Sequence, residues 1–219
     1  MHFFGMSHPF KANQTLLFIG DSITDCGREH PVGQRWNSLG GGYVSFVDSI
    51  MGAVIPGTPI TVLNTGISGN RVTDLEARWQ SDVLDLEPNW LSVMIGINDV
   101  WRQFDSESGA EQVEPEQYEL VYSSLLEKTR SQLDGLVLMT PYFLETNRED
   151  PMRLKMDAYG SITKKLAVQF DAIFVDTQAT FDHYLAHQPT ESLCADRVHP
   201  NGLGHMILAR AFLNALGVS

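Results

Sequence analysis

The stretch LLFIGDSITD, residues 16–25, is an apolar run of strand length that ends abruptly in Gly-Asp-Ser. Polar and glycine-rich sequence follows at once. In an open parallel sheet, ligands and chemistry gather just beyond the carboxyl ends of the strands, so Ser22 stands where such a fold presents a nucleophile. Gly, Asp and Ser are also ordinary turn residues, and these residues alone fit a plain turn equally well. Later segments of the chain decide between the two interpretations.

The rest of the chain alternates short apolar runs with segments of helical periodicity. Strands are predicted over about 15–20, 60–64, 90–95, 136–140 and 172–176, helices over about 42–53, 72–86, 115–133, 151–170 and 202–216, and loops over 23–38 and 100–114. Nearly continuous apolar strands that alternate with helices are typical of a parallel sheet covered on both faces. The sequence therefore predicts a three-layer α/β/α sandwich with about five parallel strands.

The chain is long enough for one α/β domain, and we expect a single domain over residues 1–219. It begins with an irregular arm, residues 1–14, whose Phe3, Phe4 and Phe10 can pack on the body of the protein or on a neighbour. With 43% hydrophobic and 19% charged residues, the composition is that of a globular protein.

Charge and motif content exclude several classes of partner and cofactor. The net charge of −12 argues against a nucleic-acid or anionic-membrane partner. No apolar run is long enough to span a membrane, and the first ten residues do not resemble a signal peptide, so we expect a cytoplasmic protein. Cys26 and Cys194 are then expected as free thiols. We expect no metal and no cofactor, because the chain has no metal-spaced Cys/His cluster, Walker loop or dinucleotide motif.

Residues of catalytic type follow several of the predicted strands. Right-handed connections bring the carboxyl ends of parallel strands to one side of the sheet, so side chains far apart in sequence meet at one edge. The residues concerned are Ser22, Gly69, Asn70, Asn98, Asp99, Asp196 and His199.

These residue types fit acyl transfer. A serine hydroxyl is a weak nucleophile and needs a base within reach, for which His199 is the candidate. Asp196, three residues earlier, can hold the imidazole in one tautomer and favour the imidazolium. An attacked ester carbonyl becomes an oxyanion that needs preset donors. Two can be the backbone N–H groups of Ser22 and Gly69, and the third can be the side-chain amide of Asn98.

The segments Gly20-Asp21-Ser22, Gly69, Gly96-Ile97-Asn98-Asp99 and Asp196-Arg197-Val198-His199 resemble, in order and spacing, the four sequence blocks of the SGNH hydrolases, also called GDSL esterases. The resemblance extends from about residue 15 to 216. It implies a flavodoxin-like sandwich, with the family's Ser, Gly, Asn and His at Ser22, Gly69, Asn98 and His199. It also implies that Asp196 is the acid of the family's Asp-x-x-His motif.

A narrower resemblance is to bacterial intracellular acetylxylan and acetyl-xylo-oligosaccharide esterases, through residues 17–28, 98–102, 196–200 and 205–212. It implies removal of acetyl groups from small acetylated sugars, namely xylose oligomers, and a large ring-like homo-oligomer such as an octamer. One departure is visible. Such a relative carries Trp just before the catalytic Asp, where this chain has Ala195, and the smaller residue opens the pocket wall.

Alternatives remain for the substrate and for three neighbours of the site. The same machinery would serve a broad-specificity lipase, lysophospholipase or thioesterase, and a chain without catalysis would be a flavodoxin-like binding domain. Asp21 is a substrate contact, a second catalytic acid or a structural hydrogen-bonding partner in its turn. Trp101 either stacks on a sugar or packs its loop or a subunit contact. Arg102 either lines the pocket or forms a surface ion pair.

Overall fold

β1 (Thr15–Gly20) is the apolar run that ends in Gly-Asp-Ser, and it lies inside the sheet. The computed structural model of the protein describes residues 8–33, 37–105 and 112–218. Its strands pair in parallel in the order β2-β1-β3-β4-β5, which is the flavodoxin-like order. The other strands are β2 (Thr61–Asn64), β3 (Trp90–Met94), β4 (Gly135–Met139) and β5 (Ile173–Val175). The predicted fold class is confirmed.

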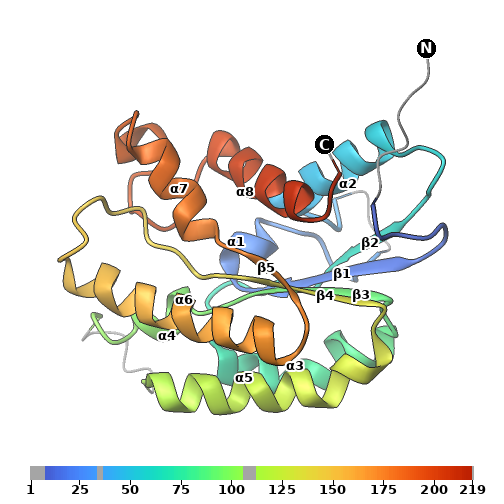
Figure 1. Ribbon diagram of the computed structural model, residues 1–219, viewed down its shortest axis with the longest axis horizontal. Helices are drawn as coiled ribbons and strands as arrows, with labels where there is room; N and C mark the ends of the chain where they lie inside the picture. The colour runs from blue at the N-terminus through green and yellow to red at the C-terminus, as the bar shows by residue number, and fades with distance from the viewer. Residues whose placement is uncertain (1–7, 34–36, 106–111, 219) are drawn as a thin grey trace.

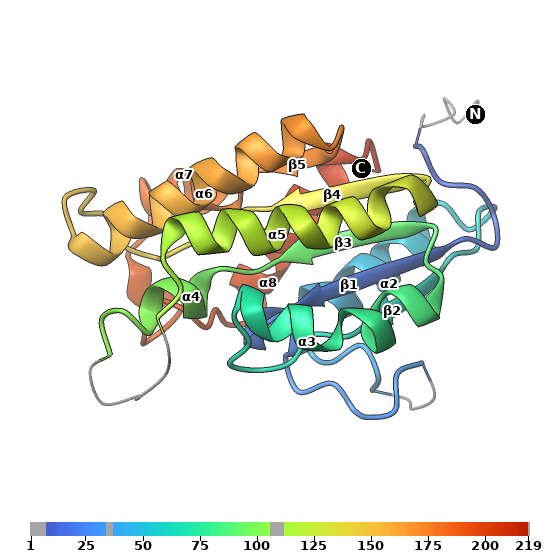
Figure 2. The same ribbon diagram turned by 90° about the horizontal axis from the view of Figure 1, so that it is seen from below.

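Helices cover both faces of the sheet (Figure 1). One face carries α2 (Tyr43–Val54), α7 (Thr177–Leu185) and α8 (Gly202–Ala215), which pack on one another through α8. The other carries α3 (Val72–Asp82), α5 (Pro115–Thr129) and α6 (Pro151–Gln169), which lie side by side in Figure 2. Short 3₁₀ turns occupy Leu84–Leu86, Arg130–Gln132 and Thr190–Ser192. The sheet is therefore the middle layer of three.

The strands are apolar because both of their faces are covered. Residues 16–19 of β1 and the whole of β4 are buried. Phe18 of β1 packs on Phe212 of α8, with 4.9 Å between the ring centroids. Loss of a buried aromatic side chain of this kind costs about 3–5 kcal/mol, so the contact fixes α8 firmly on the sheet.

The strand register determines where the functional loops emerge. Gly20 of β1 pairs with Met94 of β3, and Met94 pairs with Met139 of β4. On the other side, Phe18 of β1 pairs with Asn64, the last residue of β2. The chain segments that follow β1, β2 and β3 consequently leave the sheet at the same edge.

Two short helices stand in or beside segments that the sequence predicts as loops. α1 (Ser22–Asp25) forms at the start of the predicted 23–38 loop, because the Asp21 side chain accepts a hydrogen bond from the N–H of Ile23 and caps it. α4 (Ile97–Trp101) extends into the predicted 100–114 loop. It starts after Gly96, whose φ of +130° and close approach to Pro141 exclude a side chain.

The arm before β1 packs on the body of the protein where it is described. Phe10 is buried and its ring lies 4.8 Å from that of Trp90. Phe3 and Phe4 lie outside the described residues, as does the 106–111 part of the predicted 100–114 loop.

Candidate active site

Ser22 is the first residue of α1, directly beyond the carboxyl end of β1. Its side-chain oxygen lies 2.8 Å from Nε2 of His199, although the two residues are 177 positions apart in the chain. At this distance the imidazole nitrogen can accept the hydroxyl proton.

Asp196 holds the other side of the imidazole. Its Oδ2 lies 2.7 Å from Nδ1 of His199, while Oδ1 accepts hydrogen bonds from the N–H groups of Val198 (3.0 Å) and His199 (2.9 Å). Burial alone would raise the pKa of Asp196, but the hydrogen bonds from His199 and Val198 outweigh it and hold the pKa below its usual value. The carboxylate is therefore ionised and fixes Nδ1 as the donor nitrogen, which leaves Nε2 free to accept.

The Gly69 loop and Asn98 lie at the same edge. Gly69 has φ of +83°, a conformation that favours glycine, and its missing side chain leaves open space within 4 Å. The side-chain amide of Asn98 donates to the carbonyl oxygen of Asn70 at 3.0 Å, which leaves its second N–H for another acceptor. The N–H of Ile67, in the same loop, donates to the carbonyl oxygen of Gly20 at 3.1 Å. The structure thus brings all three predicted oxyanion-hole residues to the end of the sheet that carries Ser22.

Two loop-to-loop connections were not predicted from the sequence. Both oxygens of Asp99, which is fully buried, accept from the N–H of Val72 at 3.0 and 3.3 Å and tie α4 to the start of α3. Arg28 donates through Nε to the carbonyl oxygen of Gly66 at 2.6 Å. The sequence placed Asp99 among the residues of catalytic type, but its burial and its hydrogen bonds from the N–H of Val72 give it a structural role.

The three candidate substrate contacts are placed differently from one another. Asp21 is 1% exposed and caps α1, which supports a structural role. Burial raises its pKa to about 7, against the lowering effects of the Ile23 N–H and of His199. Trp101 lies next to the imidazole of His199, with 6.1 Å between the two ring centroids. Arg102 is partly exposed and pairs with Asp105 at 3.2 Å within its own turn.

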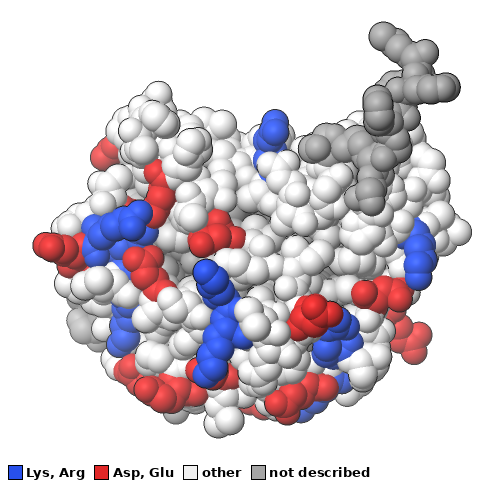
Figure 3. Space-filling view, in the orientation of Figure 1, with Lys and Arg blue, Asp and Glu red and all other residues white. Residues whose placement is uncertain are grey.

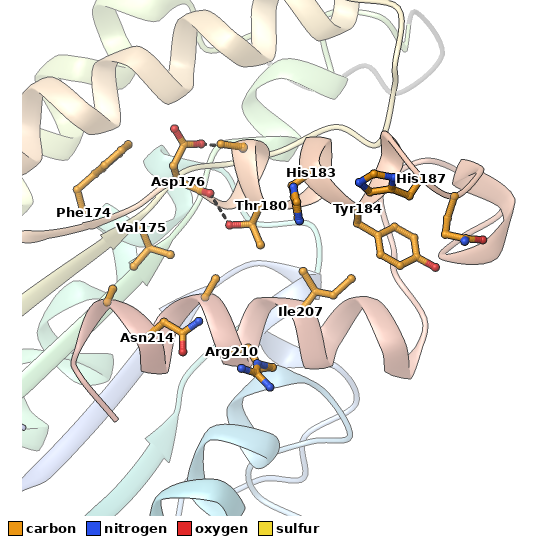
Figure 4. A pocket seen from close by; sticks show the side chains of 14 residues that line it. Phe174, Val175, Asp176, Thr180, His183, Tyr184, His187, Ile207, Arg210 and Asn214 are labelled. Carbon is orange, nitrogen blue, oxygen red and sulfur yellow. Dashed lines mark hydrogen bonds between the residues drawn. The ribbon is translucent and has the colours of Figure 1, made fainter. Parts of the chain in front are cut away.

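Two grooves outside the Ser22–His199 contact differ in character. An apolar groove of about 790 Å³ lies between α7 and α8, where Tyr184 and Ile207 face it (Figure 4). Neither Ser22 nor His199 lines this groove, so it supplies no binding surface next to that pair. A polar groove of about 640 Å³ instead borders Ala195, the residue before Asp196, and includes Arg197.

The surface carries charges of both signs. On the face shown in Figure 3, Lys and Arg side chains are interspersed with Asp and Glu, and no extended basic patch is seen on that face. In the part of the chain that the structure covers, no helix has the length and apolar character needed to cross a membrane. Within residues 8–33, 37–105 and 112–218, no three His, Cys, Asp or Glu side chains gather as a metal site would require. Cys26 and Cys194 are both free.

Comparison with known proteins agrees with this geometry. Residues 18–207 match the model of the GDSL-like Lipase/Acylhydrolase family. The chain is 50% identical over 208 residues to an acetylxylan esterase of Geobacillus stearothermophilus, covering 94% of this chain and 95% of that protein. The crystal structure of Axe2, an acetylxylan esterase from Geobacillus stearothermophilus, superposes with a TM-score of 0.93 and 49% identity over 95% of this chain and 96% of that one.

Other solved structures extend the similarity. LAE5, an alpha/beta hydrolase from the metagenome of Lake Arreo, gives a TM-score of 0.94 with 44% identity over 97% of this chain and 99% of that one. Three further structures of Axe2 carry alanine in place of a serine, a histidine or an aspartate, and each is described as a catalytic mutant of that enzyme. The residue types replaced there are those that meet at the edge of the sheet here.

Proposed function

The chain belongs to the GDSL-like Lipase/Acylhydrolase family, and from this premise we propose that it is an esterase that removes acetyl groups from small acetylated xylo-oligosaccharides. The observation that carries the proposal is the continuous hydrogen-bonded path from Ser22 through His199 to Asp196, with contacts of 2.8 and 2.7 Å. Such a path is the arrangement that activates a serine for attack on an ester.

The reaction follows from the roles of these groups. His199 takes the proton of Ser22 as the serine oxygen bonds to the acetyl carbon. The charge that develops on the carbonyl oxygen is met by the N–H groups of Ser22 and Gly69 and by the amide of Asn98. The bond between the acetyl carbon and the sugar oxygen then breaks, and His199 gives its proton to that oxygen. Water, deprotonated by His199, hydrolyses the acetyl-serine in a second, equivalent step.

A short acyl group and a sugar fit the surroundings of Ser22 better than a fatty acyl chain. Each additional buried methylene gains about 0.8 kcal/mol only where apolar surface covers it, and the apolar groove between α7 and α8 does not border Ser22. Trp101, beside His199, offers a flat face to a sugar ring. The polar groove next to Ala195 offers hydrogen-bonding groups to further sugar units.

Two assays test the substrate. The kcat/KM on 4-nitrophenyl esters should be highest for acetate and fall steeply by hexanoate. Acetylated xylobiose should release acetate, and Trp101→Ala should reduce kcat/KM on that sugar ester more than on 4-nitrophenyl acetate, which serves as the internal control. A maximum at octanoate or longer would instead assign the protein to the lipase or thioesterase alternative.

The cellular setting and assembly form part of the same proposal. Acetylated oligosaccharides are small enough to be imported, and two free thiols suit a reducing compartment, which supports a cytoplasmic enzyme. The similarity to the acetylxylan esterases supports a single catalytic domain over residues 1–219 and a homo-oligomer. Light scattering coupled to size-exclusion chromatography measures the mass of the assembly, and a monomer at micromolar concentration would contradict it.

A further inference from the structure

We propose that Arg78 is a positioning residue that sets the distances between Ser22 and the two oxyanion-hole donors on other segments, the N–H of Gly69 and the side-chain amide of Asn98. Arg78 lies on α3, and its side chain is 13% exposed. It touches none of the reacting groups directly. The inference rests on the proposed function, because it assigns Arg78 a role in that same catalytic centre.

Each nitrogen of the Arg78 guanidinium bonds to a different part of the centre. Nη2 donates to the carbonyl oxygen of Gly20 at 3.1 Å, two residues before Ser22. Nη1 donates to the carbonyl oxygen of Thr65 at 2.6 Å, where the Gly69 loop begins. Nε donates to the side-chain oxygen of Asn70 at 2.7 Å, where that loop ends. One side chain therefore connects the end of β1 with both ends of the loop.

The connection continues to the third donor. The carbonyl oxygen of Asn70 accepts the hydrogen bond from the Asn98 side chain at 3.0 Å. A displacement of Asn70 would therefore also move the amide that is directed at the oxyanion. The guanidinium is itself held by Asp82, whose Oδ2 lies 2.6 Å from Nη1, so it is fixed on a rigid helix.

These contacts need an arginine. The guanidinium is a planar fork with five N–H donors. Its three nitrogens donate at once to Gly20, Thr65 and Asn70. A lysine retains the charge but has a single nitrogen that cannot reach all three segments. The charge alone therefore does not explain the arrangement.

The experiment compares Arg78→Met with Arg130→Met on 4-nitrophenyl acetate. Arg130 also bonds three backbone carbonyl oxygens, those of Phe170, Leu133 and Asp171, but it precedes β4 and so lies at the opposite edge of the sheet from Ser22. Since misplacement by about 1 Å can cost about a hundredfold in rate, Arg78→Met should lower kcat about tenfold to a hundredfold with little change in KM. Arg130→Met should leave kcat essentially unchanged.

A double-mutant cycle with Asn98→Ala distinguishes positioning from a general loss of structure. If Arg78 acts through the oxyanion hole, Arg78→Met should lower kcat much less in the Asn98→Ala background than in the wild type. Arg78→Lys, measured in the same cycle, keeps the test valid if Arg78→Met does not fold. Equal kcat for the Arg78 and Arg130 variants, or fully additive losses in the cycle, would overturn the inference. Ser22→Ala in the same assay separates the two hypotheses, because an active Ser22→Ala protein refutes the proposed function itself.

Discussion

Replacing Asp196 by Asn should nearly abolish activity while preserving the fold. In the wild type, Oδ1 accepts two backbone N–H groups and Oδ2 accepts from Nδ1 of His199. An asparagine has one oxygen, and the two N–H groups of Val198 and His199 require it at the Oδ1 position. Its NH₂ group must then face Nδ1, which has to become an acceptor.

The consequence is transmitted across the imidazole ring. With Nδ1 accepting, the proton of neutral His199 sits on Nε2, 2.8 Å from the oxygen of Ser22. That nitrogen can no longer accept the serine proton. In the chymotrypsin triad the equivalent change lowers kcat about 10⁴-fold, which corresponds to about 5.4 kcal/mol of activation free energy, and we expect a loss of that order here.

The matched control is Asp150→Asn. The Oδ1 of Asp150 accepts the N–H groups of residues two and three positions ahead, Met152 at 2.9 Å and Arg153 at 3.1 Å, just as Asp196 does, but no histidine is involved. The free energy of unfolding of both variants should lie within about 1 kcal/mol of the wild-type value, because Asn accepts the same backbone N–H groups as Asp in this local geometry. If Asp196→Asn kept more than a tenth of the wild-type kcat on 4-nitrophenyl acetate, the assignment of the tautomer would be refuted.

Further predictions concern the oxyanion hole and the pH dependence of stability. Asn98→Ala should cost about 3–4 kcal/mol in kcat with little change in KM, because the donor acts on charge present only in the transition state; a pure KM effect in steady-state kinetics would make Asn98 a substrate-binding residue. Burial, aided by the charge of His199, lowers the pKa of His205 from an ordinary 6.5 to about 4. As the pH falls from 6.5 to 4, His205 is therefore protonated in the unfolded chain before it is protonated in the folded protein, and the free energy of unfolding decreases. The advantage of wild type over His205→Gln in urea unfolding should therefore be about 2–3 kcal/mol smaller at pH 4.5 than at pH 7.5, and an equal difference at both would show that His205 titrates normally.

The strands and the meeting of Ser22, Asp196 and His199 at one end of the sheet could be predicted because the signals for them are local. β1 and β4 are buried on both faces, so their sequences are continuous apolar runs. Ser22 lies two residues after the end of β1, and Asp196 and His199 share one short segment before the last helix. In a parallel sheet the carboxyl ends of the strands lie at the same end of the sheet, so the fold class alone predicts that these positions lie close together.

The supports of the site could not be predicted in the same way. Arg78 reaches Gly20 across 58 positions and Arg28 reaches Gly66 across 38, and both bond to backbone carbonyl groups, which carry no sequence signature. The contact of Asp99 could not be predicted for the same reason, because its partner is the backbone N–H of Val72. Such contacts depend on how the loops are packed, and hydropathy or spacing does not encode them. The short helix α1 lies where the sequence predicts a loop, because its formation depends on a single capping hydrogen bond to the side chain of Asp21.

The most direct test of the account is to label the nucleophile. A fluorophosphonate reacts covalently with an activated serine, and peptide mass spectrometry of the inactivated protein locates the adduct. We expect one adduct per chain, on Ser22, that forms in proportion to the loss of esterase activity and does not form in Asp196→Asn. An adduct on another residue, or full activity after stoichiometric labelling of Ser22, would contradict it.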